Sequence, residues 1–355
     1  MKSVRAVVVG CGTMGSSHAR AYAGNEGFEL VGLVDRSAEK AESLSKELGN
    51  VPVFPSLDEA IKAAHPDAAA ICTYPETHFV LTHQSIMAGL HVFVEKPIAA
   101  TVQEATAIAR LAAEKNRKVV VGYILRHHPV WQRFIEEARQ LGKPLVMRMN
   151  LNQQSSGSAW EVHKNLMRSM SPIVDCGVHY VDVMCQMTRS QPVRVQAIGA
   201  RLTEEIDNAM YNYGHLHVVF EDGSVGWYEA GWGPMMSEVA FFVKDVIGPR
   251  GCVSIAERQA VQGGDSSDID SHTKTSSLVK HDAATMQNTR IDTSDEPGHQ
   301  ELCNREQMHF LHAIQENLDL TDHLSDAVNS LRIVLAADES VRTGTIVHLT
   351  ERGSL

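Results

Sequence analysis

Several features are missing from this sequence, and each absence excludes a class of protein. No apolar run approaches the 18 residues that a membrane-spanning helix needs, and the start carries neither a signal-peptide nor a twin-arginine pattern. The Lys and Arg residues form no cluster and the formal net charge is −11, so we expect no nucleic-acid and no membrane partner. The six cysteines form no C-x-x-C pair, which is typical of a reduced compartment rather than a disulfide framework. These absences predict a cytoplasmic protein with a small-molecule partner.

The 18 histidines are numerous, but their spacing does not favour a metal site. No H-E-x-x-H sequence occurs. His127 and His128 are adjacent and point apart in any regular element, whereas His215 and His217 alternate on a predicted strand and share a face. We therefore expect no protein-bound catalytic metal.

The stretch Val4–Gly15, VRAVVVGCGTMG, joins a β-branched run to three glycines in G-x-G-x-x-G spacing, and a predicted helix over 16–23 follows. Strand, glycine turn and helix form the context in which this spacing indicates a dinucleotide site. Gly10 permits the tight turn, Gly12 lets the backbone approach a pyrophosphate, and Gly15 lets the helix pack against the strand. The N–H groups at the helix start then hold the phosphates. We expect cofactor contacts from Gly10, Gly12, Thr13, Met14 and Gly15.

An acidic residue follows this turn at the distance that a dinucleotide site requires. Asp35 ends the predicted strand Phe28–Val34 and lies twenty residues past Gly15. Its carboxylate is expected to bind the ribose 2′-hydroxyl and to repel a 2′-phosphate, which favours NAD. Arg36 comes next and can pair with a phosphate, so NADP stays open as a second cofactor. The alternative for the whole stretch is a plain structural βαβ unit.

The length of 355 residues exceeds the size at which one core keeps growing, so we expect two domains. Over residues 1–122, strand-like and helix-like segments alternate, which predicts an α/β Rossmann domain with a doubly wound parallel sheet. Ligands bind at the carboxyl ends of such strands, where Thr73, Lys96 and Tyr123 fall. Over residues 123–355 the pattern predicts an α+β domain with an open, largely antiparallel sheet.

Within this second domain we expect helices over 129–141, 173–187, 301–316 and 325–342. The expected strands cover 145–152, 193–201, 213–221, 224–231, 238–247 and 252–255. Residues 153–171 are polar and contain glycine and serine, and we expect residues 258–298 to be loop with one or two edge strands.

A lysine at a strand end is the first candidate for chemistry. Lys96, in Glu95-Lys96-Pro97, follows the predicted strand His91–Val94. A buried lysine beside a nicotinamide can donate a hydrogen bond to a substrate oxygen, and desolvation lowers its pKa so that it can relay a proton. The Lys96–Pro97 bond can be cis. The alternative is a surface lysine before a turn.

A carboxylate and a histidine at helical spacing are the second candidate. Asp175 and His179 are i and i+4, and Asp182 follows at i+3 from the histidine. A carboxylate beside a histidine fixes its tautomer and raises its basicity, which suits a base that removes a carbinol proton. The alternative is a helix N-cap followed by a core histidine, and the residues by themselves favour this alternative slightly.

Five segments occur in an order that resembles one family. They are GCGTMG with the strand-end Asp35, TYPETH, AGLHVFVEKP, DCGVHYVD and the closing helix DAVNSLRIVLAADESVRTG. Together they resemble the Gfo/Idh/MocA oxidoreductases, a family that includes inositol dehydrogenases and glucose-fructose oxidoreductase, and the resemblance covers nearly the whole chain.

The resemblance implies a role for each matching residue. Lys96 would be catalytic, and Asp175 and His179 would be the acid and the histidine of the D-x-G-x-H motif. Glu95 would contact the nicotinamide side. The segment with Thr73, Tyr74 and His78 would run past the nicotinamide ribose and the diphosphate. The second domain would form the interface of a homo-oligomer, a dimer or a tetramer, through its sheet.

Two departures from the family pattern affect the substrate side. Residues 169–174, SMSPIV, stand where many members have two or three glycines, and Pro172 stiffens this loop. Residues 122–129 lack the asparagine of a common asparagine–arginine pair, although Arg126 keeps the arginine. From position alone, the expected substrate contacts are Tyr123, Arg126, Trp160, His163 and Lys164. In the alternative, Trp160 is a core anchor and Lys164 a solvated charge.

The function that follows is NAD-dependent hydride transfer from a secondary alcohol of a sugar, a sugar derivative or a cyclitol. His179 would take the hydroxyl proton, Lys96 would stabilise the oxyanion, and Asp175 would orient the pair. Two alternatives stay open: a glycosidase that uses bound NAD for transient oxidation, and a sensor of NAD or sugar without catalysis. We favour a small neutral sugar or polyol because no pyrophosphate-recognition pattern is visible.

Overall fold

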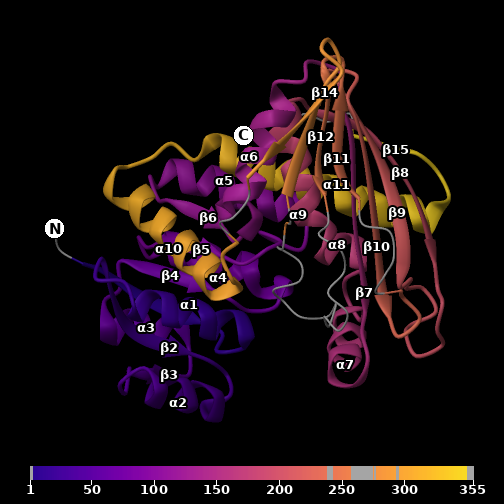
Figure 1. Cartoon of the computed structure of the whole chain (residues 1–355). Helices are drawn as coiled ribbons and strands as arrows, with labels where there is room; N and C mark the ends of the chain where they lie inside the picture. Colours follow the sequence, from indigo (N-terminus) through magenta and orange to yellow (C-terminus); the bar gives the residue numbers. More distant parts are fainter. Residues whose placement is uncertain (1–2, 238–242, 257–274, 276, 293–295, 350–355) are drawn as a thin grey trace. The chain divides into compact units, whose positions relative to one another are not determined.

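The computed structural model describes residues 3–237, 243–256, 275, 277–292 and 296–349, and it divides into two compact units (Figure 1). The first unit holds the chain up to Ile124 together with Gln300–Val328. The second unit holds Leu125–His299 and the described chain from Asn329 onward. The chain first passes from one unit to the other between Ile124 and Leu125, close to the domain boundary expected at 122/123. The segment 300–328, which the sequence places in the second domain, packs with the first unit.

The first unit contains a six-stranded parallel sheet in the order β3-β2-β1-β4-β5-β6. The strands are β1 Val4–Val9, β2 Phe28–Val34, β3 Val53–Phe54, β4 Ala68–Ile71, β5 His91–Val94 and β6 Val119–Val121. The strand order reverses between β1 and β4, and in doubly wound sheets a ligand binds at that point. The expected Rossmann sheet is confirmed.

Helices connect these strands, and several begin at the caps that their sequence provides. They are α1 Thr13–Ala23, α2 Ala38–Glu47, α3 Leu57–Ala64, α4 Pro75–Met87 and α5 Val102–Glu114. Ser37 and Ser56 cap α2 and α3, and Thr101 forms a capping box with Glu104 at α5. Helix α1 begins at Thr13, three residues earlier than expected, because Gly12 itself is the N-cap.

The returning segment completes the core of the first unit through α10 His299–Gln315 and the start of α11 Thr321–Thr343. The Phe310 ring lies 6.3 Å from the rings of both Phe28 and Phe93, measured between centroids. Two hydrogen bonds tie the same segment to β6 and its approach, from Lys118 Nζ to the Leu318 carbonyl at 2.7 Å and from the Val121 amide to His323 Nε2 at 2.8 Å. These contacts explain why residues 300–328 belong to the first unit.

The second unit contains a nine-stranded mixed sheet in the order β14-β13-β12-β11-β7-β10-β9-β8-β15. Only the β7–β10 pair is parallel among the described pairs of this sheet. The strands are β7 Val146–Gln154, β8 Pro192–Ala200, β9 Tyr213–Phe220, β10 Val225–Gly233, β11 Lys244–Gly248, β12 Gly251–Ala256, β13 Ser277–Asp282, β14 Gln287–Ile291 and β15 Val347–His348. The expected mostly antiparallel sheet is confirmed.

The helical elements of this part of the chain are the 3-10 turn η1 Ile124–His127, α6 Pro129–Arg139, α7 Gly157–Leu166, α8 Pro172–Asp175, α9 Gly177–Thr188 and the rest of α11. One expectation needs correction, because the helix expected over 173–187 is divided at Cys176. Residues 153–171, to which the sequence assigned no element, contain α7, which buries Trp160 and His163. The strand expected over 238–247 is described only from Lys244, since residues 238–242 lie outside the described residues.

The two faces of the second sheet differ. Helices α6, α8 and α9 contact one face. The other exposes apolar side chains of four strands, namely Val146, Ile198, Val225 and Ile247. No helix among the described residues has the length and apolarity that crossing a membrane requires.

Candidate active site

The glycine turn after β1 has the geometry that each of its glycines predicts. A side chain at Gly10, where φ is +95°, would place Cβ 2.4 Å from the Cys72 carbonyl oxygen. At Gly15 a Cβ would lie 1.7 Å from the Gly10 carbonyl oxygen. At Gly12 it would meet nothing within 4 Å, so the backbone there borders open space. Gly10 and Gly15 are therefore required for packing, and Gly12 leaves room for a ligand.

The start of α1 offers backbone N–H groups to that open space. No side chain caps the helix, and its first turn carries no acidic residue. Gly12 and Thr13 are exposed and Met14 is half-buried. Uncapped N–H groups and the positive end of the helix dipole favour an anion such as a pyrophosphate.

Asp35 links the end of β2 to this turn. Its Oδ2 accepts a hydrogen bond from the Cys11 amide at 2.7 Å, and its Oδ1 accepts one from the Ser37 amide at 2.8 Å. The carboxylate is half-buried and the neighbouring Arg36 is exposed. Asp35 is thus oriented by the turn itself, as a ribose-binding carboxylate must be.

The segment after β4 presents Thr73 and Tyr74 but turns His78 inward. Thr73 Oγ1 lies 2.7 Å from Thr77 Oγ1, and Tyr74, the N-cap of α4, is 63% exposed. The fully buried His78 ring contacts two carbonyl oxygens, with Nδ1 2.7 Å from Pro97 O and Nε2 3.0 Å from Thr73 O. His78, which was expected to contact the cofactor, therefore holds the backbone of Thr73 and Pro97 in this structure.

The Glu95-Lys96-Pro97 turn follows β5. Lys96 is half-buried, and its peptide bond to Pro97 is cis. Glu95 is buried; its Oε2 accepts a hydrogen bond from the Lys96 amide at 3.1 Å, and its Oε1 lies 2.8 Å from His18 Nε2. Glu95, which the resemblance places at the nicotinamide, is thus held in position by contacts within the first unit.

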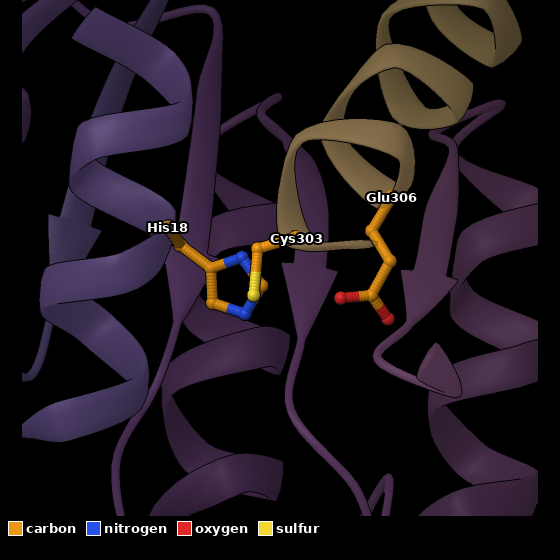
Figure 2. Close-up of side chains that lie close together, drawn as sticks. All are labelled: His18, Cys303 and Glu306. Carbon is orange, nitrogen blue, oxygen red and sulfur yellow. The ribbon is translucent and has the colours of Figure 1, made fainter. Parts of the chain in front are cut away.

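A buried polar cluster surrounds His18, and sequence reasoning missed it. Among the described residues, His18, Cys303 and Glu306 bring their possible ligand atoms within 4.8 Å of one another, from α1 and α10 (Figure 2). Both His18 ring nitrogens already have partners, since Nδ1 lies 2.9 Å from Gln307 Nε2 and Nε2 contacts Glu95. Structural zinc sites take four ligands, and this group offers three. His18 is thus held by Glu95 and Gln307, with Cys303 and Glu306 beside it in a buried polar cluster.

Burial sets the protonation of this network. Desolvation, followed by the charge of Glu95, raises the pKa of Glu306 well above its usual value, so Glu306 is a neutral acid. Burial also raises the pKa of the Cys303 thiol. No local sequence pattern could have shown this, because Glu306 and His18 are separated by most of the chain.

In the second unit, Asp175 ends α8 and His179 lies in the first turns of α9; both are half-buried. Ser171 caps α8 by accepting a hydrogen bond from the Val174 amide at 3.2 Å. The Ser171 hydroxyl donates to Asp338 Oδ1 at 2.7 Å, and Asp338 also accepts from the Tyr211 hydroxyl at 2.5 Å. This loop, where many members of the family that the sequence resembles have glycines, is therefore fixed by a side-chain network.

An aromatic and thiol cluster adjoins Asp175. Cys176 Sγ lies 3.6 Å from Asp175 Oδ2 and 3.5 Å from Gln153 Oε1. Trp232 Nε1 donates to the same Gln153 oxygen at 2.8 Å, and the His163 ring stacks on Trp232 with centroids 4.4 Å apart. Burial lowers the pKa of His163 to about 4. Of this cluster, the sequence pointed to Asp175 and His163 but not to Gln153 or Trp232.

The remaining expected substrate residues have structural partners. Arg126 Nε donates to Asp182 Oδ2 at 2.9 Å, and its Nη2 lies 2.5 Å from Oδ1. Lys164 Nζ lies 2.7 Å from Glu161 and 2.8 Å from Glu205. Trp160 packs with Cys176 and Trp232, and Tyr123 is fully buried. For Trp160 and Lys164 these contacts fit the structural alternative that the sequence left open.

Comparison with known proteins places this geometry in a family. Residues 4–123 match the model "Oxidoreductase family, NAD-binding Rossmann fold", and residues 133–244 match the "GFO/IDH/MocA C-terminal domain". The chain belongs to the GFO/IDH/MocA oxidoreductase family. Its N-terminal domain is therefore an NAD-binding Rossmann domain, as the glycine turn predicted.

The chain is similar to dehydrogenases of this family. It is 31% identical over 210 residues to a UDP-N-acetylglucosamine 3-dehydrogenase of Acidithiobacillus ferrooxidans, covering 59% of this chain and 62% of that protein. It is 26% identical over 225 residues to an inositol 2-dehydrogenase of Rhizobium meliloti, covering 62% and 66%. A scyllo-inositol dehydrogenase structure from Lactobacillus casei, with bound NAD(H) and scyllo-inositol, aligns with a TM-score of 0.78 at 20% identity, covering 99% and 100%. The matched sequence thus spans less than two thirds of either curated relative, and the structural likeness supports the fold.

Proposed function

We propose that the protein is an NAD-dependent dehydrogenase that oxidises a secondary alcohol of a sugar, a sugar derivative or a cyclitol. The observation that carries the proposal is the glycine turn, which is open at Gly12 and whose Cys11 amide binds the Asp35 carboxylate. The same unit holds the Lys96 backbone in the E-K-P turn. The relatives named above act on a nucleotide sugar and on inositol, according to their names. These substrates share a ring that bears secondary hydroxyls.

The proposed chemistry assigns one task to each polar residue. NAD, when bound, supplies the acceptor for the hydride that the substrate carbon loses. Lys96 donates a hydrogen bond to the substrate oxygen and stabilises the charge that develops there. His179 accepts the hydroxyl proton, and Asp175 orients Lys96 and His179. Replacing Lys96 or His179 with Ala is expected to lower turnover by about 100-fold or more while cofactor affinity is retained.

For the cofactor we propose NAD over NADP. The Asp35 carboxylate keeps its orientation through the amides of Cys11 and Ser37, so a 2′-phosphate would meet a fixed negative charge. Arg36 is exposed and is the residue that would offset this preference. Fluorescence titration of both cofactors tests the choice, and tighter binding of NADP would contradict it.

A small neutral sugar or polyol is the proposed substrate. Its contacts are proposed to come from Tyr123, Arg126, Trp160, His163 and Lys164, of which Arg126 also pairs with Asp182 and Lys164 with Glu205. A screen of sugars, polyols and cyclitols for NADH formation tests the activity. Release of free sugar from a glycoside without net NADH would indicate the glycosidase alternative, and ligand binding without any turnover would indicate a sensor.

We also propose a homo-oligomer that forms through the open face of the second sheet, and a cytoplasmic location. The exposed apolar side chains of that face support the first proposal. The absence of disulfides among the six cysteines, all of them described, agrees with the second. Light scattering and cell fractionation test them respectively, and a monomer or a secreted protein would contradict them.

A further inference from the structure

The Glu95-Lys96-Pro97 turn is contacted on both sides of Lys96 by a buried histidine of the first unit. His18, on α1, contacts the side chain of Glu95 at 2.8 Å. His78, on α4, contacts the carbonyl oxygen of Pro97 at 2.7 Å. Both histidines are fully buried. Neither can approach a ligand from solvent, so their effect on Lys96 passes through its two neighbours.

Hydrogen-bond chemistry fixes the tautomer of the His18 ring. The Gln307 amide nitrogen is a donor, so His18 Nδ1 accepts from it at 2.9 Å and Nε2 carries the hydrogen that Glu95 accepts. The second oxygen of Glu95 accepts the Lys96 amide at 3.1 Å. A continuous chain of hydrogen bonds therefore runs from α10 through His18 and Glu95 to the Lys96 backbone, beside the cluster of Figure 2.

The surroundings leave Glu95 little freedom to move. A Cβ at Gly122 would lie 3.2 Å from the Glu95 carboxyl, so a side chain there would press against that group. Glu306 adds no second negative charge, because burial and Glu95 itself hold its pKa well above the usual range. Glu95 is thus restrained by His18, by the Lys96 amide and by the backbone of residue 122.

The His78 ring faces two carbonyl oxygens, and both are acceptors only. Burial lowers the pKa of His78, so the ring is neutral near pH 7 and carries one hydrogen. Its one hydrogen can be donated to Pro97 O, 2.7 Å from Nδ1, or to Thr73 O, 3.0 Å from Nε2. His78 thereby joins the ends of β4 and β5 and restrains the residue that follows Lys96.

We propose that His18 and His78 are positioning residues for Lys96: together they fix Glu95 and Pro97 and so set the direction in which the Lys96 side chain projects. The inference rests on the proposed function, because it assigns the two histidines to the work of the proposed catalytic lysine. Reactions of this kind require the acid–base group within hydrogen-bond reach of the substrate oxygen. A lysine with four rotatable bonds meets that requirement only if its backbone is held.

The test compares leucine and glutamine at each position. His18→Leu and His78→Leu remove the hydrogen bonds and are expected to lower kcat by about 10- to 100-fold, while KM and the NAD dissociation constant change less than about threefold. His18→Gln and His78→Gln restore an N–H donor and are expected to recover most of the loss. The matched control is His83→Leu, an exposed residue of the same helix as His78, which is expected to leave kcat unchanged.

A second readout needs no turnover. Hydrogen exchange of the Lys96 amide, which donates to Glu95, is expected to accelerate at least tenfold in both leucine variants and to slow again in both glutamine variants. Should a leucine variant fail to fold, Glu95→Gln, which keeps the size of the side chain, replaces it with the same expectation. Wild-type exchange and wild-type kcat in the folded variants would overturn the inference. Unchanged turnover in Lys96→Ala would instead overturn the proposed function, so the two failures are distinguishable.

Discussion

Glu306 is a carboxyl group enclosed in the first unit, and its protonation has a consequence for stability. Its pKa in the folded chain is raised well above the value of 4.5 that an exposed glutamate has. The folded protein therefore keeps a proton on Glu306 that the unfolded chain releases above about pH 4.5. Stability from this residue is complete below that pH and is lost as the pH rises toward the raised pKa.

Glu306→Gln should remove this pH dependence, because glutamine keeps the size and neutrality of the protonated acid. We expect the melting temperature of the variant to exceed that of the wild type by a margin that grows from pH 5 to pH 8. Calorimetry at both pH values measures it. The control is Glu301→Gln, on the exposed side of α10. An equal margin at both pH values would show that Glu306 is ionised in the folded protein.

His163 provides a prediction of opposite sign. Burial lowers its pKa from 6.5 to about 4, so between these values the unfolded chain binds a proton that the folded chain does not. Stability should therefore fall as the pH is lowered from 6.5 to 4. His163→Phe, which keeps the ring on Trp232, should lose less stability over this window. NMR titration checks the cause directly: a His163 pKa near 6.5 would contradict the burial argument.

The turn between β1 and α1 separates a packing role from a ligand role within one motif. Gly15→Ala would place Cβ 1.7 Å from the Gly10 carbonyl oxygen and should destabilise the protein by about 3 kcal/mol or more. Gly12→Ala meets open space and adopts a φ of −76° that alanine tolerates, so stability should change by no more than about 1 kcal/mol.

Cofactor binding should distinguish the same two variants. In Gly12→Ala the new methyl group occupies the space where the backbone would approach the pyrophosphate, so we expect at least tenfold weaker NAD binding in a fully folded protein. Titration of intrinsic fluorescence, with melting temperature as the control for folding, provides the measurement. Wild-type affinity in Gly12→Ala would show that the dinucleotide lies elsewhere.

The secondary structure of the first unit was predictable because its signals are local. Helices α2, α3 and α5 begin at Ser37, Ser56 and Thr101, whose side chains accept a hydrogen bond from the following turn. Helix α7 was not predicted, because its buried residues stand out only once Trp232 is known to cover His163. Whether such a short helix forms depends on tertiary contacts, and the periodicity of the sequence does not contain that information.

The same limit applies to the candidate site. The glycine turn, Asp35 and the E-K-P turn could be predicted because each is a contiguous motif at a strand end. The partners of Glu95 could not, because Gln307 returns to His18 from 289 residues away. The assignment of residues 300–328 to the first unit depends on the same return of the chain and was missed for the same reason.

The open face of the second sheet carries an apolar row that crosses four adjacent strands. Val225 on β10 pairs with Val219 on β9 and with Val146 on β7, and Val146 pairs with Ile247 on β11. Val146, Val225 and Ile247 are each between 36% and 39% exposed. A row of this kind is self-complementary about a twofold axis, which is the usual geometry of a homodimer.

A charge in the middle of this row should therefore act on the assembly and leave the fold of the chain intact. If the proposed oligomer forms through this face, Val225→Glu is expected to shift it toward the monomer in light scattering at micromolar concentration, because two carboxylates would be buried in the interface. Val225→Thr preserves the shape of the side chain without a charge and should stay assembled. A wild-type protein that is already monomeric, or an assembled Val225→Glu variant, would show that this face does not form the interface.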